Sequence, residues 1–142
     1  MTGDFDDLIS ELEDAIQKEE KGVYSERTLE EAYNPKNVGV LEDPDGYGRI
    51  KGSCGDTIQI YIKVGGGKIV DCKFITDGCG SSTASGSVVT EMAKGKTIEE
   101  ALLIQDKDVL AVLDGLPEES LHCPVLAVNT LRAAIDNYKK KG

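Results

Sequence analysis

A chain of 142 residues has the length of one ordinary domain, and it can bury a hydrophobic core without disulfide bonds. Its formal charge of −10 argues against nucleic acid as the main partner, because phosphate binding needs clustered lysines and arginines. No apolar run has the length of a membrane span, and the acidic start resembles neither a secretory signal nor an arginine-rich presequence. We therefore expect an intracellular, cytoplasmic protein, in which four cysteines are more typical of metal binding or reactivity than of disulfides.

The first segment, residues 4–20, is predicted to form an amphipathic helix that ends near Lys21-Gly22. Its apolar residues recur at helical spacing, with acidic residues on the other face: Phe5, Leu8, Ile9, Leu12 and Ile16. A single apolar stripe needs a surface to pack on, either the following domain or a partner. We accordingly divide the chain into an N-terminal extension, residues 1–22, and a domain, residues 23–142.

A second, short helix is predicted over residues 25–32, with Ser25 as its N-cap and Asn34-Pro35 at its end. Residues 35–48 are rich in Pro, Gly, Asp and Asn, and this composition is typical of a loop.

Three strands are predicted in the middle of the chain. Residues 57–64 alternate apolar and polar side chains, and three glycines then form a turn into another strand over residues 68–76. Residues 47–53 supply a third strand that leads into Cys54. We expect an antiparallel sheet with one face covered by helices and the other partly exposed to water.

The remainder of the chain is predicted to be helical. Four helices are expected: one capped by Ser81 or Ser82 that ends at Gly95, one from a Thr97–Glu100 capping box to Ile104, one from Asp106 to Leu113, and one from near Ser120 to Lys139. The last helix has six apolar residues at helical spacing that should be buried: Leu121, Val125, Val128, Leu131, Ile135 and Tyr138. This order predicts an α+β fold, a small antiparallel three-stranded sheet covered on one face by helices, with an extra N-terminal helix.

The four cysteines occupy different kinds of position. Cys72 lies within a strand, where alternation places it with Val70 and Phe74 on the core face. The other three lie at the ends of elements, where loops leave room for a ligand: Cys54, Cys79 and Cys123. Because a helix N-terminus stabilises a thiolate, the last two of these are favoured both as metal ligands and as nucleophiles.

Two further groups accompany these cysteines. Asp56 follows Cys54 by two residues, so on an extended segment both side chains point to the same side. His122, the only histidine in the sequence, precedes Cys123 and is a candidate ligand or proton carrier. Thiolates with an imidazole and a carboxylate suit zinc, iron or an iron–sulfur cluster. The sequence has no CxxC pair, and dispersed mixed ligands favour a metal that is meant to leave.

Seven short segments, in their order and spacing, resemble the IscU/NifU family of iron–sulfur cluster assembly scaffolds, which share a NifU-like N-terminal domain. The likeness extends from about Tyr24 to the C-terminus. The segments are Tyr24-Ser25-Glu26, Asn34-Pro35-Lys36-Asn37-Val38-Gly39, Cys54-Gly55-Asp56, Lys68-Ile69-Val70-Asp71, Gly78-Cys79-Gly80-Ser81-Ser82, Lys94-Gly95-Lys96-Thr97 and Leu121-His122-Cys123.

The resemblance implies a scaffold or carrier, not an enzyme, that assembles a [2Fe–2S] cluster and transfers it to acceptor apoproteins. It implies that three thiolates hold the cluster, with Asp56 or His122 as the fourth ligand, where the three are Cys54, Cys79 and Cys123. A PLP-dependent cysteine desulfurase of the IscS/NifS type would deliver sulfur as a persulfide, with Cys123 as its acceptor. Iron would bind here, and zinc in the cluster-free form. A carboxylate ligand such as Asp56 would bind the cluster more weakly than a thiolate and would let the cluster leave. A cluster near the surface would favour dimer or trimer contacts.

One segment departs from part of the family. Members served by a dedicated Hsp70-type chaperone carry Leu-Pro-Pro-Val-Lys before the last motif, whereas this chain has Leu116-Pro117-Glu118-Glu119-Ser120. The missing proline and lysine put that chaperone partnership in doubt.

Three alternative functions compete with the scaffold. A SufU-like zinc-dependent sulfur acceptor, a sulfurtransferase of the same fold, resembles this chain less, because that branch has an insertion and lacks the histidine before the last cysteine. A Cys–His hydrolase is disfavoured because neighbouring residues on a helix point about 100° apart, so His122 and Cys123 are not expected to form a direct hydrogen bond. A purely structural zinc module would hold its metal against exchange.

Overall fold

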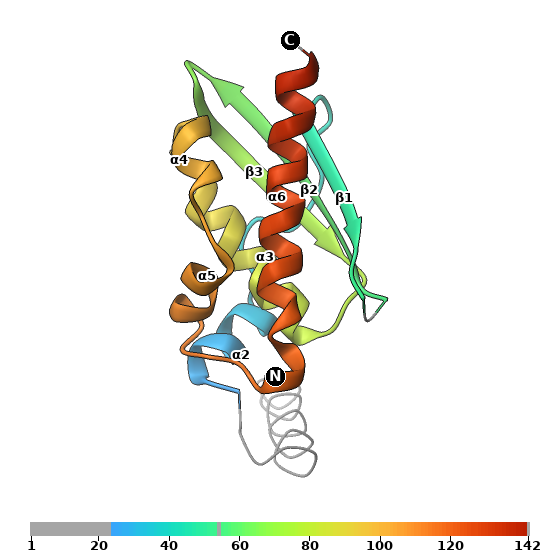
Figure 1. The fold of residues 1–142 in the computed structure, drawn as a ribbon, viewed down its shortest axis with the longest axis vertical. Helices are drawn as coiled ribbons and strands as arrows, with labels where there is room; N and C mark the ends of the chain where they lie inside the picture. The colour runs from blue at the N-terminus through green and yellow to red at the C-terminus, as the bar shows by residue number, and fades with distance from the viewer. Residues whose placement is uncertain (1–23, 54, 142) are drawn as a thin grey trace, which may run out of the picture.

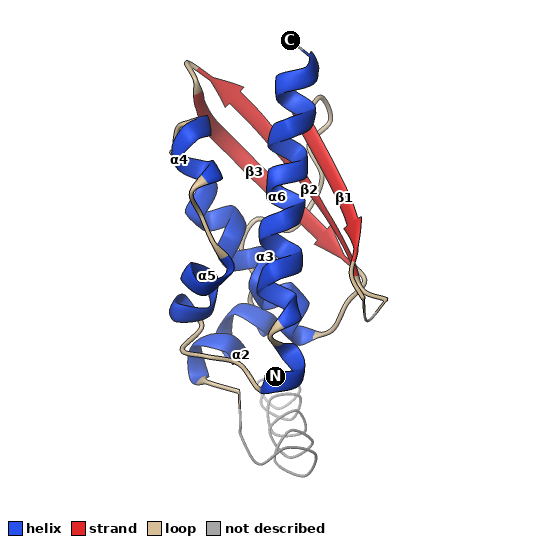
Figure 2. Cartoon of the chain, viewed as in Figure 1, coloured by secondary structure: helices blue, strands red, loops and turns tan. Residues whose placement is uncertain are grey.

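The computed structural model describes residues 24–53 and 55–141, and within them the chain forms two layers, a sheet and a set of helices on one of its faces (Figures 1 and 2). The strands are β1 (Gly46–Lys51), β2 (Thr57–Gly65) and β3 (Lys68–Thr76). The helices are α2 (Glu26–Tyr33), α3 (Gly80–Ala93), α4 (Ile98–Leu102), α5 (Asp106–Val112) and α6 (His122–Lys141), with a short 3-10 turn, η1 (Glu118–Ser120), before α6. The predicted α+β fold is confirmed. The helix predicted over residues 4–20 lies outside the described residues.

The sheet is antiparallel, in the order β1-β2-β3, and its inner face packs against the helices. The strands contribute six residues to the core: Ile58, Ile60, Ile62, Ile69, Cys72 and Phe74. Helix α6 lies against β1, and two glycines of that strand make the close approach possible. A Cβ atom at Gly46 would lie 2.3 Å from the carbonyl oxygen of Ala134, and one at Gly48 would lie 2.6 Å from the amide nitrogen of Ala134. Side chains at these positions would therefore push α6 off the sheet.

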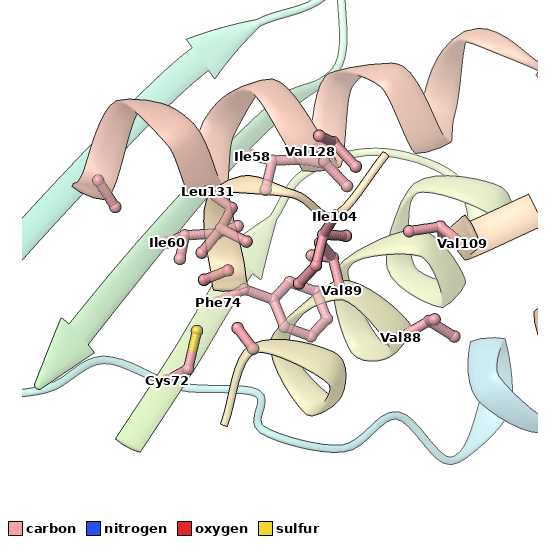
Figure 3. Packing of buried hydrophobic residues seen from close by; sticks show 14 of the residues in the cluster. Ile58, Ile60, Cys72, Phe74, Val88, Val89, Ile104, Val109, Val128 and Leu131 are labelled. Atoms are coloured by element: carbon pink, nitrogen blue, oxygen red, sulfur yellow. The ribbon is translucent and has the colours of Figure 1, made fainter. Parts of the chain in front are cut away.

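Strand β3 contains a bulge that the alternation of its sequence does not reveal. Lys63 pairs with Asp71 and Val64 pairs with Ile69, so Val70 is an extra residue without an opposite partner. The bulge turns Val70 outward, and its side chain is 57% exposed. The prediction that Val70 shares a face with Cys72 is therefore wrong, whereas the prediction that Cys72 is a core residue is confirmed (Figure 3).

Helix α3 starts one residue after Cys79, which is its N-cap. The prediction that Ser81 or Ser82 caps this helix is wrong, because both serines lie inside its first turn and are buried there. The predicted end is confirmed: Lys94 is the C-cap, and Gly95 adopts the left-handed conformation with φ of +86°.

Helix α6 buries a different face at its start from the one predicted. Val128, Leu131 and Ile135 are buried as expected, but Leu121 is 40% exposed and Val125 is 41% exposed. Leu121 precedes the helix, and Val125 lies two residues from both buried Cys123 and buried Ala127, about 200° around the axis from each. The buried face of α6 therefore includes Cys123 at its start and leaves Val125 exposed.

No helix in the described part of the chain is long and apolar enough to cross a membrane.

Candidate metal centre

Three points of the fold converge on one site: the turn before β2, the start of α3 and the start of α6. The turn supplies Asp56, the N-cap position of α3 supplies Cys79, and the first two residues of α6 are His122 and Cys123. Pro124 follows within the first turn of α6, where a missing backbone N–H costs no helical hydrogen bond. Cys54, the remaining candidate, lies outside the described residues.

The side chains of these residues are within ligand distance of one another. One ligand atom each from Asp56, His122 and Cys123 lies within 4.8 Å of the others. The Cys79 Sγ atom lies 3.9 Å from Asp56 Oδ2. Two thiols, an imidazole and a carboxylate form a mixed donor set that suits zinc and iron. The structure thus brings together four of the five candidate ligands.

His122 and Cys123 also contact each other directly. The Cys123 Sγ atom lies 3.6 Å from His122 Nε2, so the prediction that these neighbours do not form a direct hydrogen bond is wrong. The contact joins the two side chains at the start of α6, where His122 is the first residue of the helix. The geometric argument against a Cys–His pair therefore does not hold.

Cys79 is the exposed, acidic member of the thiol pair. A hydrogen bond from Cys123 lowers the pKa of Cys79 from 9.0 to about 5, against the opposing effects of burial and of the Asp56 charge. The backbone N–H groups of Ser81 and Ser82, in the first turn of α3, lower this pKa further without forming a capping hydrogen bond. Cys79 is accordingly a thiolate at neutral pH.

Cys123 is the buried, protonated member. Its hydrogen bond to the Cys79 thiolate and its burial both raise the pKa of Cys123. A metal bound by both sulfurs must displace the proton of the Cys123 thiol. By contrast, burial is the largest of the causes that raise the pKa of Cys72 to about 12, as expected of a thiol in the core.

Serine hydroxyls beside the thiols form part of the site that sequence reasoning missed. Ser82 Oγ donates to Asp56 Oδ2 at 2.7 Å and lies 3.5 Å from Cys123 Sγ. Ser81 Oγ donates to the Tyr24 hydroxyl at 2.9 Å, which ties the start of the domain to the same helix. The available signal was spacing, because residues three apart on a helix share a face and Ser82 follows Cys79 by three.

Comparison with known proteins identifies the family. The NifU-like N-terminal domain family matches residues 23–142. An iron–sulfur cluster assembly scaffold protein, IscU 1 of Archaeoglobus fulgidus, is 48% identical over 120 residues, which are 84% of this chain and 78% of the relative. The IscU scaffold protein of Aquifex aeolicus is 45% identical over 121 residues, which are 83% of this chain and 77% of the relative.

A solved structure has the same fold. It is the crystal structure of a Fervidobacterium islandicum protein named as a candidate iron–sulfur cluster assembly scaffold for the SUF system. It superimposes with a TM-score of 0.69 at 28% sequence identity, over 79% of this chain and 96% of that one. The resemblance drawn from the sequence motifs is confirmed, and the chain belongs to the IscU/NifU family of iron–sulfur cluster assembly scaffolds.

Proposed function

We propose that this protein assembles a [2Fe–2S] cluster from iron and desulfurase-derived sulfur and transfers the cluster to acceptor apoproteins. The observation that carries the proposal is the convergence of two thiols, an imidazole and a carboxylate on one partly open site. The membership in a family whose relatives are named as scaffold proteins supports it. The cluster is here a cargo that is built and handed on.

Three thiolates are the proposed cluster ligands: Cys54, Cys79 and Cys123. Asp56 or His122 completes the set, since both have a ligand atom within 4.8 Å of the Cys123 sulfur. Zinc would occupy the same site in the cluster-free protein, because its donor preferences overlap with those of iron. A carboxylate in the fourth position binds a thiolate-ligated metal less strongly than another thiolate would, and this favours release of the cluster.

Sulfur delivery requires a thiolate that attacks the outer sulfur of a desulfurase persulfide, so that the S–S bond breaks and the desulfurase cysteine leaves as a thiolate. We propose Cys123 as the acceptor, as the family resemblance implies. Cys79 is a competitor, because its exposed, low-pKa thiolate is the better nucleophile before metal binds. Mass spectrometry of the persulfide in Cys79→Ser and Cys123→Ser variants distinguishes the two.

We retain the proposed division of the chain into an extension, residues 1–22, and a scaffold domain, residues 23–142. A PLP-dependent cysteine desulfurase and apo iron–sulfur proteins are the proposed partners, because the site needs a sulfur donor before assembly and an acceptor after it.

The test is anaerobic reconstitution with ferrous iron, cysteine and a cysteine desulfurase, followed by visible absorption and Mössbauer spectroscopy. We expect a [2Fe–2S] spectrum that is lost when any one of three thiols is replaced, in Cys54→Ser, Cys79→Ser and Cys123→Ser. Cys72→Ala is the matched control and should keep the spectrum, since Cys72 lies in the core. A protein that forms no cluster but holds one zinc tightly and accepts a persulfide would instead be a SufU-like sulfur acceptor.

A further inference from the structure

The Ser82 hydroxyl lies between two of the candidate ligands. Its Oγ atom is 2.7 Å from Asp56 Oδ2 and 3.5 Å from Cys123 Sγ, and the side chain is fully buried. A hydroxyl has one proton to donate, and the 2.7 Å contact assigns it to the carboxylate. The contact between Ser82 Oγ and Cys123 Sγ is the longer of the two. One side chain of α3 thus contacts both the carboxylate from the turn before β2 and the thiol from α6.

The backbone at Gly78 provides the space in which this contact forms. A Cβ atom at Gly78 would lie 2.6 Å from Asp56 Oδ2 and 2.7 Å from Ser82 Oγ. Both separations are too short for non-bonded atoms, so a methyl group here would displace the hydroxyl or the carboxylate. The absence of a side chain at Gly78 therefore leaves the space that the Ser82–Asp56 hydrogen bond occupies.

A second serine on the same helix provides an internal comparison. Ser85 lies one turn further along α3 and is also fully buried, but its Oγ atom has no hydrogen-bond partner within the described ranges. Small polar residues are thus common in this part of α3, and burial alone does not bring a serine to the site. Of these two serines, Ser82 contacts Asp56 and Cys123, whereas Ser85 Oγ has no partner among the described residues.

We propose that Ser82 is a positioning residue of this metal site, which holds the Asp56 carboxylate beside Cys123 so that the carboxylate can bind metal with little rearrangement. Hydrogen bonds to a ligating carboxylate orient it and reduce the freedom it loses when the metal binds. Without the hydroxyl, the carboxylate can rotate away from the thiols toward water. The role of Ser82 rests on the proposed function of the site, but it concerns one contact that the scaffold proposal does not require.

Zinc affinity, measured anaerobically on the full chain by competition with a chelator, tests this role without a cluster or a desulfurase. We expect Ser82→Ala to bind zinc about tenfold more weakly than the wild type, the lower end of the range for losing a hydrogen bond to a metal ligand. Gly78→Ala keeps the hydroxyl but occupies its space, and it should weaken zinc binding in the same direction. Ser85→Ala, the matched control, should stay within about twofold of the wild type.

A double variant separates positioning from general damage to the fold. In an Asp56→Ala background, Ser82→Ala should have no further effect on zinc affinity, because the group that it positions is gone. The visible spectrum of the Co²⁺-loaded protein gives a second readout, since its bands report the ligand set and geometry. Ser82→Ala should change these bands, whereas Ser85→Ala should not.

Three results would overturn the role of Ser82: wild-type zinc affinity in Ser82→Ala, equal losses in Ser82→Ala and Ser85→Ala, or an undiminished loss in the Asp56→Ala background. Reconstitution of the wild type keeps the two proposals distinguishable. A wild type that binds zinc and builds a cluster, while Ser82→Ala binds zinc normally, refutes the positioning role alone. A wild type that binds neither zinc nor a cluster refutes both.

Discussion

Two carboxylates contact serines of the same helix, α3, with different consequences. Glu31 of α2 accepts a hydrogen bond from Ser87 Oγ at 2.5 Å, and Asp56 accepts one from Ser82 Oγ at 2.7 Å. Glu31 is also paired with Arg27 and Lys36, each with a nitrogen 2.9 Å from its Oε2 atom. We call the first group, Glu31 with Ser87, Arg27 and Lys36, the Glu31 cluster.

The difference lies in the neighbours of each carboxylate. Burial raises the pKa of Glu31, but hydrogen bonds from Ser87, Lys36 and Arg27 outweigh it, so the carboxylate stays ionised and neutralised. Asp56 instead faces two thiols and an imidazole, donors that can share a metal with it. We therefore infer that a buried serine–carboxylate contact stabilises the fold at Glu31 and, under the proposed function, positions a metal ligand at Asp56.

Glu31→Ala should cause the largest loss of stability, because it removes the anion of a buried network and leaves a void between α2 and α3. We expect the free energy of unfolding, from urea denaturation, to fall by about 3 kcal/mol with zinc affinity unchanged. Asp136→Ala is the control, since that exposed acid pairs only at the surface with Lys140 and should cost less than about 0.5 kcal/mol. A loss below 1 kcal/mol in Glu31→Ala, by the scale of ordinary surface changes, would contradict a structural role.

The pH dependence of alkylation at Cys79 should show that its sulfur is a thiolate at neutral pH. Its pKa is lowered to about 5, so the thiolate is present above that pH and is lost as the pH falls through it. In a Cys54→Ser background, the iodoacetamide rate at Cys79 should change less than about twofold between pH 6 and 8. An ordinary cysteine changes by roughly 100-fold over that range.

Cys123→Ala removes the hydrogen-bond donor and should restore a steep pH dependence to Cys79, since that bond is the largest cause of the lowered pKa. Peptide mapping by mass spectrometry identifies the modified residue. A steep rise in the Cys79 rate from pH 6 to 8 in the parent protein would show that its thiol is ordinary.

Ser87→Ala and Ser82→Ala should differ in what they change. Removing Ser87 withdraws a hydrogen bond from a buried charge, and we expect about 1.5 kcal/mol less stability with no change in zinc affinity. Removing Ser82 should affect stability less and zinc affinity more. Thermal unfolding and chelator competition on both variants check this. Equal losses of stability and of zinc affinity in the two variants would show that Ser82 and Ser87 have the same role.

Local signals in the sequence predicted most of the fold. The bounds of β3, the Ser25 cap and the capping box of Thr97 and Glu100 are confirmed, because each depends on neighbours in the chain. The bulge at Val70 could not be predicted, since alternation assumes an unbroken ladder and a bulge is defined by the opposite strand. Exposure of Val125 likewise depends on which face of α6 meets the sheet.

The site was predicted in part. The sequence singled out residues that the structure brings together, namely Asp56, Cys79, His122 and Cys123. The sequence favours Ser81 or Ser82 as a helix cap, because a serine near a helix start has that role far more often than contact with a distant carboxylate. The unequal pKa values of Cys79 and Cys123 could not be predicted either, because they arise from a hydrogen bond between residues 44 positions apart in the chain.

Asp56→Ala should have the smallest effect on stability and a several-fold effect on cluster release. A carboxylate beside the Cys79 thiolate is repelled by it, so its loss should change the free energy of unfolding by less than about 1 kcal/mol, in contrast to Glu31→Ala. Transfer of the reconstituted cluster to an apo-ferredoxin should slow several-fold if Asp56 is the fourth ligand, because a carboxylate is displaced more easily than a thiolate. Transfer at the wild-type rate would mean that Asp56 does not control release, and a loss of stability as large as that of Glu31→Ala would mean that both carboxylates are structural.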